Sequence, residues 1–194
     1  MPYKALSCQH ALCNAHHLRE LTYLLEEQGQ AWAGDMIEVL THANHLDNHN
    51  CADNQAPNYN SKRYQDEVLD LRHLYDAVLA HAEVANPIAP STGKRGRTKQ
   101  SKATNLIGRL RDYSDDVWRF MAQADVPFTN NLAEQTVRMP KVKQKVSGCF
   151  RTLEGARAYC VIRSYCATMH KQGANVFESL VAAFKGATPQ PCFG

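Results

Sequence analysis

Hydrophobic side chains recur every three or four residues over most of this sequence, which is the period of an amphipathic helix. Leu18, Leu21 and Leu24 form one such face. The pattern predicts helices over residues 16–28, 32–49, 61–85, 104–110, 115–124, 130–138 and 152–171, with a last one from residue 175. Glycine and proline stop helices, and Gly29 and Gly173 stand where two of these end.

Two segments depart from the helical period. Residues 8–14 are compatible with a short strand, and residues 141–150 alternate loosely, which favours a loop or a short hairpin. Pro140 is expected to end the helix before them, and residues 50–60 form a loop by their turn chemistry. The fold class is therefore mainly α, with at most two or three short strands.

Composition adds a partner class and a compartment. The 194 residues carry a net charge of +3, and basic residues concentrate in the C-terminal half while residues 35–90 are close to neutral or acidic. Such an asymmetry points towards nucleic acid. No apolar run approaches the roughly 18 residues of a membrane helix, and the start is not a signal peptide, so we expect a cytoplasmic protein. Seven irregularly spaced cysteines are expected to be free thiols.

The stretch with the clearest chemistry surrounds Glu134. This carboxylate falls in the first turns of a predicted helix, where Asn130 and Asn131 can cap the chain. Many basic residues follow it: Arg138, Lys141, Lys143, Lys145, Arg151, Arg157 and Arg163. A helix-capping glutamate is one interpretation. A magnesium ligand beside a phosphodiester, with the basic residues on the DNA strands, is the other.

The runs TNNLAEQTVR (129–138) and SGCFRTLEGARAY (147–159), then a helix ending in KQG, resemble the C-terminal signature of the insertion sequence 66 family of transposases. The resemblance implies that Glu134 is the third acid of a DDE triad, with Asn130, Asn131 and Ala133 around it. The family usually has Asp in place of Thr129 and Arg in place of Gln135, which leaves a DNA contact at Gln135 in doubt.

Two further matches extend the resemblance to about residues 8–185. Cys13-Asn14-Ala15-His16 resembles a Cys-x-Ala-His block that follows the second catalytic aspartate, which implies that Cys13 and His16 lie near the site. The basic loop at 91–102 resembles the region between the second and third acids. DNA contacts are expected from the loop and from the segment after Glu134, at Lys94, Arg95, Arg97, Arg138, Lys141, Lys143, Lys145 and Arg151.

The resemblance implies the helical C-terminal portion of an RNase H-like catalytic domain, in which two aspartates and a glutamate hold two Mg²⁺ ions. Both aspartates should precede the Cys13 block, where this chain has no acid, and the others fall in helical or loop patterns, such as Asp35, Asp66, Asp112 and Asp116. We therefore expect a truncated transposase that is inactive alone and binds no Mg²⁺. Its expected divisions are a sheet remnant at 1–14, a helical insertion at 15–125, C-terminal helices at 126–186 and a tail at 187–194.

Other interpretations stay open. Cys8, His10, Cys13 and His16 contain half of a zinc site, and His42, His45 and His49 form either a ligand row or a polar helix face. The chain could instead be a non-catalytic fragment that binds transposon-end DNA or pairs with a full-length transposase, or a decayed remnant. Helices that lack a sheet to cover would pack on one another or leave apolar residues such as Val161 and Ile162 exposed, which favours self-association.

Overall fold

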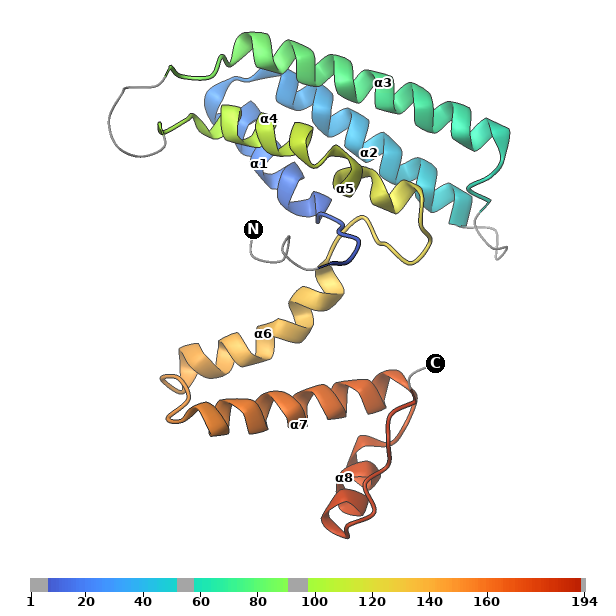
Figure 1. Ribbon diagram of the computed structural model, residues 1–194, viewed down its shortest axis with the longest axis vertical. Helices are drawn as coiled ribbons and strands as arrows, with labels where there is room; N and C mark the ends of the chain where they lie inside the picture. The colour runs from blue at the N-terminus through green and yellow to red at the C-terminus, as the bar shows by residue number, and fades with distance from the viewer. Residues whose placement is uncertain (1–6, 52–57, 91–97, 193–194) are drawn as a thin grey trace. The chain divides into compact units, whose positions relative to one another are not determined.

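The computed structural model describes residues 7–51, 58–90 and 98–192, and the chain divides into two compact units (Figure 1). The N-terminal unit comprises residues 1–130 and the C-terminal unit comprises residues 131–194. All regular structure in the described ranges is helical, with no strand among them. The expectation of a mainly helical fold is thus confirmed.

The N-terminal unit is a bundle of four longer helices, which lie side by side in Figure 1, followed by two short ones. Their bounds are α1 Asn14–Gln28, α2 Ala31–Cys51, α3 Lys62–Ala85, α4 Lys102–Asp112, α5 Ser114–Trp118 and the 3₁₀ helix η2 Arg119–Met121. Local signals set several ends. The Ser61 and Ser101 hydroxyls accept backbone N–H groups at the starts of α3 and α4, and Gly29 ends α1 with φ 62°.

Apolar side chains from all of these helices form one core in the N-terminal unit. Its largest fully buried members include Trp32, Tyr75 and Phe120. Tyr75 packs edge-on against Trp118 at 5.5 Å between ring centroids, and its hydroxyl donates to the Leu110 carbonyl at 2.9 Å. Burial raises the pKa of the Tyr75 hydroxyl, so this group stays a hydrogen-bond donor at any ordinary pH.

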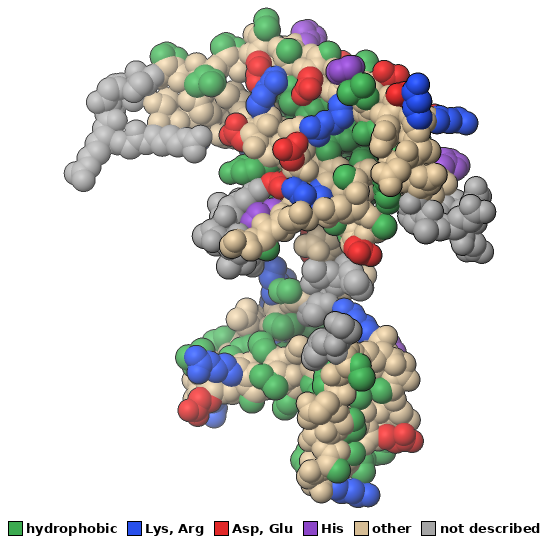
Figure 2. Space-filling view, turned by 45° about the vertical axis from the view of Figure 1, so that its right-hand side comes forward, with side chains coloured by type: hydrophobic (Ala, Val, Ile, Leu, Met, Phe, Trp, Pro, Cys, Tyr) green, Lys and Arg blue, Asp and Glu red, His purple; other side chains and the backbone are tan. Residues whose placement is uncertain are grey.

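The C-terminal unit consists of α6 Asn131–Val146, α7 Leu153–Lys171 and α8 Val176–Phe184. Among its described side chains, only Met169 and Ser179 are buried. Apolar side chains lie on its surface, as Figure 2 shows, and Val161 and Ile162 are 67% and 55% exposed. Exposed apolar stripes are what the sequence predicted for helices without a sheet to cover.

Residues 8–14 do not form the expected short strand. Residues 9–13 are irregular and α1 begins at Asn14, because the backbone here hydrogen-bonds to a helix and a loop and not to a strand. The Leu12 N–H donates to the Asp116 carbonyl at 2.9 Å. The expected helix over 115–124 is also shorter. Helix α5 ends at Trp118, and η2 follows it directly and ends at Met121.

The expected stop at Pro140 is wrong, as is the loop or hairpin at 141–150. Helix α6 continues through Pro140 to Val146. A proline ring has a helical φ and removes a single hydrogen-bond donor, and the exposed lysines beyond it are good helix formers. The described part of the tail is hydrogen-bonded to α7 and to the residue that follows it. Tyr165 donates to the Pro189 carbonyl at 3.0 Å, and the Cys192 N–H donates to the Gln172 side chain at 3.2 Å.

No described helix combines the length and apolar composition that crossing a bilayer would need.

Candidate functional site

The Cys13–His16 block is joined to the segment that leads into α6. The Asn14 N–H donates to the Phe128 carbonyl at 3.0 Å, and the Asn130 N–H donates to the Cys13 sulfur at 3.2 Å. The ring of Phe128 is held in turn by Phe120, edge-on at 5.0 Å between centroids. These contacts place the Cys13–His16 block beside residues 128–130, although more than a hundred residues separate them along the chain.

A buried polar network fixes the block to the bundle. The Asn14 side-chain amide donates to the Val117 carbonyl at 3.0 Å, and its oxygen lies 3.0 Å from Nδ1 of His17. Since that oxygen can only accept, Nδ1 of His17 carries the proton. Burial, aided by the nearby charge of Arg109, lowers the pKa of His17 to about 4, so the imidazole is neutral at pH 7.

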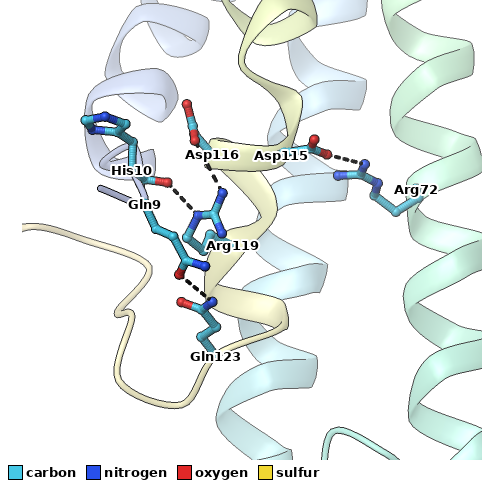
Figure 3. Close-up of polar contacts among 7 residues, drawn as sticks. All are labelled: Gln9, His10, Arg72, Asp115, Asp116, Arg119 and Gln123. Carbon is cyan, nitrogen blue, oxygen red and sulfur yellow. Dashed lines mark hydrogen bonds and ion pairs between the residues drawn. The ribbon is translucent and has the colours of Figure 1, made fainter. Parts of the chain in front are cut away.

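Arg119 anchors the residues before α1 (Figure 3). Its Nε donates to the His10 carbonyl at 2.6 Å, and its Nη2 lies 3.6 Å from the Asp116 carboxylate. Gln123 adds a hydrogen bond to Gln9 at 2.9 Å. On α5, the short helix that also carries Asp116, Asp115 pairs with Arg72 of α3 at 3.2 Å. Both aspartates of α5 are therefore engaged by arginines.

Glu134 lies exposed in the first turn of α6, as the sequence predicted for this acid. Arg138, Lys141 and Lys145 follow at spacings of four, seven and eleven residues, which place them on the same face of the helix as Glu134. We call these four residues the α6 stripe. Lys143, nine residues after Glu134, points to the opposite side. Lys143 and the three basic residues of the stripe are all exposed.

The positive charge of the chain resides in the C-terminal unit. Residues 131–194 contain nine lysines and arginines against three acids, a net charge of +6. Residues 1–130 contain thirteen against sixteen, a net charge of −3. An anionic polymer is therefore attracted to the unit that carries the α6 stripe.

The other predicted site residues are distributed as follows. Arg151 is exposed in the turn before α7, Asn130 contributes its backbone N–H to Cys13, and Asn131 is the first residue of α6. Lys94, Arg95 and Arg97 lie outside the described residues. Sequence analysis missed Arg119 and His17 as parts of this arrangement, since their positions in helical patterns give no sign of their partners.

The described metal-ligating side chains of the N-terminal unit form no group of three close ligands among themselves. The Cys13 sulfur and a ring nitrogen of His16 lie within 4.8 Å of one another, and no third such ligand from the described part of residues 1–130 joins them. A structural zinc site needs four ligands. His42, His45 and His49 are all exposed on α2, as a solvated helix face would be.

The aspartates that the sequence considered are not gathered for metal binding. Asp35, Asp66 and Asp112 lie on α2, α3 and α4, and Asp116 faces Arg119. Among the residues that the structure describes, no group of three close ligands contains two carboxylates. A pair of magnesium ions needs more than one carboxylate, and the described residues gather no such group.

Comparison with known proteins adds one finding. A family model described as "Transposase IS66 family" matches residues 1–158, which takes in the whole helical bundle, α6 and the first turn of α7. Neither a search of curated proteins nor a search of solved structures gave a match.

Proposed function

Because the chain belongs to the Transposase IS66 family, we propose that Glu134 is the glutamate of a DDE triad and that the α6 stripe beside it binds DNA. A transposase acts on DNA, so the partner class follows from the family. The observation that carries the proposal is the alignment of one carboxylate with three unpaired cations on a single exposed helix face.

The stripe has the chemistry of a phosphodiester site. Within the described part of the chain, Arg138, Lys141 and Lys145 have no hydrogen-bond or ion-pair partner, so their charges are available to strand phosphates. Glu134 at the helix start stands where the backbone N–H groups favour an anion. An acid among cations suits a metal ligand held next to a phosphate.

Mg²⁺ is the metal that this chemistry implies, and Glu134 supplies one ligand for it. No second carboxylate is grouped with Glu134 among the described residues, so these residues supply a single carboxylate for the metal. The proposal is that these 194 residues alone bind DNA and do not cut it. The proposed setting of Glu134 in the whole enzyme is an RNase H-like domain, with α7 covering a sheet through Val161 and Ile162.

A supercoiled-plasmid nicking assay tests the absence of cleavage. We expect the purified chain to produce no nicked circles with Mg²⁺ or Mn²⁺. Metal-dependent nicking that disappears in Glu134→Gln would overturn the proposal that the chain is inactive alone while upholding Glu134 as catalytic. Nicking that persists in Glu134→Gln would show contamination or another site.

The DNA contact is tested by fluorescence anisotropy with labelled duplex DNA over a range of salt concentrations. Replacing Arg138, Lys141 and Lys145 together by glutamine removes up to three phosphate contacts, so the slope of log K against log salt should fall by about 2–3. Lys143→Gln is the matched control on the other face of α6, and we expect it to change the slope by much less.

A second arm tests the position of Glu134. With no metal present, Glu134→Gln removes a negative charge beside the phosphates, so the affinity for DNA should rise by a few fold. Glu154→Gln, on α7, is the control and should leave the affinity unchanged. Equal effects of the two variants would show only a change in net charge and would contradict the placement of Glu134 at the DNA.

A non-catalytic role is the second candidate, in which the chain binds transposon ends or pairs with a full-length transposase. It is favoured because no second carboxylate is grouped with Glu134 among the described residues. Salt-sensitive DNA binding without nicking, together with inhibition of an active transposase of the same element, is the result expected for this role.

A further inference from the structure

A second group of cations, far from the α6 stripe in the sequence, lines a pocket in the N-terminal unit. It is a pocket of about 420 Å³ between α1 and α4. Its polar lining comes from Arg19, Glu20, Tyr23, Lys102, Asn105 and Arg109, and Leu24 and Leu106 contribute apolar walls. Three cations and one acid thus line a concave surface, on a unit whose overall charge is negative.

The cations of this pocket are incompletely neutralised. Arg109 pairs with Glu20 at 2.5 Å, but its Nε is buried and has no hydrogen-bond partner among the described residues. Arg19 and Lys102 are exposed and form no ion pair within the described part of the chain. The Lys102 ammonium lies 4.2 Å from the centre of the Tyr23 ring, and this contact holds it at the pocket rim.

This set of groups fits an anion such as a phosphodiester better than a neutral ligand. One positive charge remains on each of Arg19 and Lys102 after Glu20 neutralises Arg109, and a phosphodiester oxygen accepts from both kinds of donor. The apolar walls lower the local dielectric and strengthen such contacts.

We propose that the pocket between α1 and α4 binds a backbone phosphate of DNA, and so gives the helical bundle a strand contact of its own. The inference shares with the proposed function only the premise that DNA is the partner. It does not depend on Glu134 or on the α6 stripe.

Lysine acetylation footprinting on the unmodified chain tests the proposal without any variant. The chain offers a matched control, because α3 and α4 both begin with a capping serine followed by an exposed lysine, Lys62 in one and Lys102 in the other. Duplex DNA should slow acetylation of Lys102 several fold and leave Lys62 unchanged. Equal behaviour of the two lysines would overturn the proposal.

The same footprint separates the two DNA contacts. Protection of Lys141 and Lys145 reports the α6 stripe, whereas protection of Lys102 reports the pocket, so either can fail while the other holds. A further arm replaces DNA by inorganic phosphate at the same phosphate concentration. Protection of Lys102 by inorganic phosphate equal to that by DNA would mean a free-anion site and would overturn the assignment to a DNA strand.

Binding assays on four variants complete the test. Lys102→Gln and Arg19→Gln should each weaken DNA binding and lower the salt slope by about 1, while Lys62→Gln should not. Glu20→Gln removes the acid that competes for Arg109, so DNA affinity should rise even if the melting temperature falls. Unchanged or weaker binding by Glu20→Gln, in a chain with a native circular dichroism spectrum, would contradict the proposal.

Discussion

At the scale of single residues, the most consequential group is the buried pair of Asn14 and His17. Both side chains are almost fully enclosed, and the amide of Asn14 joins α1 to the Val117 carbonyl across the bundle. Sequence analysis identified the Cys13–His16 block but could not foresee this pair. A single sequence shows the helical period of α1, yet it does not show which polar residue of the helix faces inward.

His17 makes the fold sensitive to acid. Its folded pKa of about 4 lies below the usual histidine pKa of 6.5, so the unfolded chain binds the proton first as the pH falls. Stability that is present above pH 6.5 should decline towards pH 4, by at most about 3 kcal/mol from this group.

Thermal unfolding across this pH range measures the effect. His17→Gln should flatten the acid decline, since glutamine has no proton to take up. His42→Gln, at an exposed position of α2, should leave the decline as it is. An unaltered pH profile in His17→Gln would show that other groups cause the acid sensitivity.

At the scale of elements, the hydrophobic period located most of the helices well. The predicted helix over 61–85 is α3 Lys62–Ala85, and the one over 152–171 is α7 Leu153–Lys171. The caps at Ser61 and Thr152 explain this accuracy, because a capping residue can be recognised from the sequence next to it. The end of α6 was not predicted, because Pro140 carries a local cost in a helix. The helical preference of the residues beyond it outweighs that cost.

Pro140 should therefore be a weak point of α6. Pro140→Ala restores one hydrogen-bond donor and removes a steric clash, which is worth up to about 3 kcal/mol in a helix interior. We expect amide exchange in α6 to slow, by up to about a hundredfold, when measured by mass spectrometry. Pro127→Ala, outside the helices, is the control, and an equal response to both changes would contradict a helical Pro140.

At the scale of the whole molecule, burial is divided unevenly. The N-terminal unit holds the core, whereas the C-terminal unit buries only Met169 and Ser179 among its described side chains. The charge pattern along the sequence anticipated the basic C-terminal part. Exposure of the C-terminal stripes was only one of the two outcomes that the sequence predicted, because apolar stripes look alike in a sequence whether or not another element covers them.

Hydrogen exchange measured along the whole chain should reflect that division. Amides of α2 and α3 should exchange slowly and those of α6 and α7 faster, by orders of magnitude, since few buried contacts oppose local opening there. Dilution of the protein provides the check on self-association. Protection of α7 that is strong at high concentration and lost on dilution would show that a second copy covers Val161 and Ile162.

The paired backbone of Asn14 and Phe128 has one more consequence. The chain enters the helical bundle and leaves it at neighbouring points, so the bundle is a cassette whose two ends meet. Segments with adjacent ends tolerate removal and exchange, as domain insertions do. A short turn could in principle replace everything between these residues and still deliver the chain to the start of α6. The fold therefore allows the size of the cassette to change without moving the start of the helix that carries Glu134.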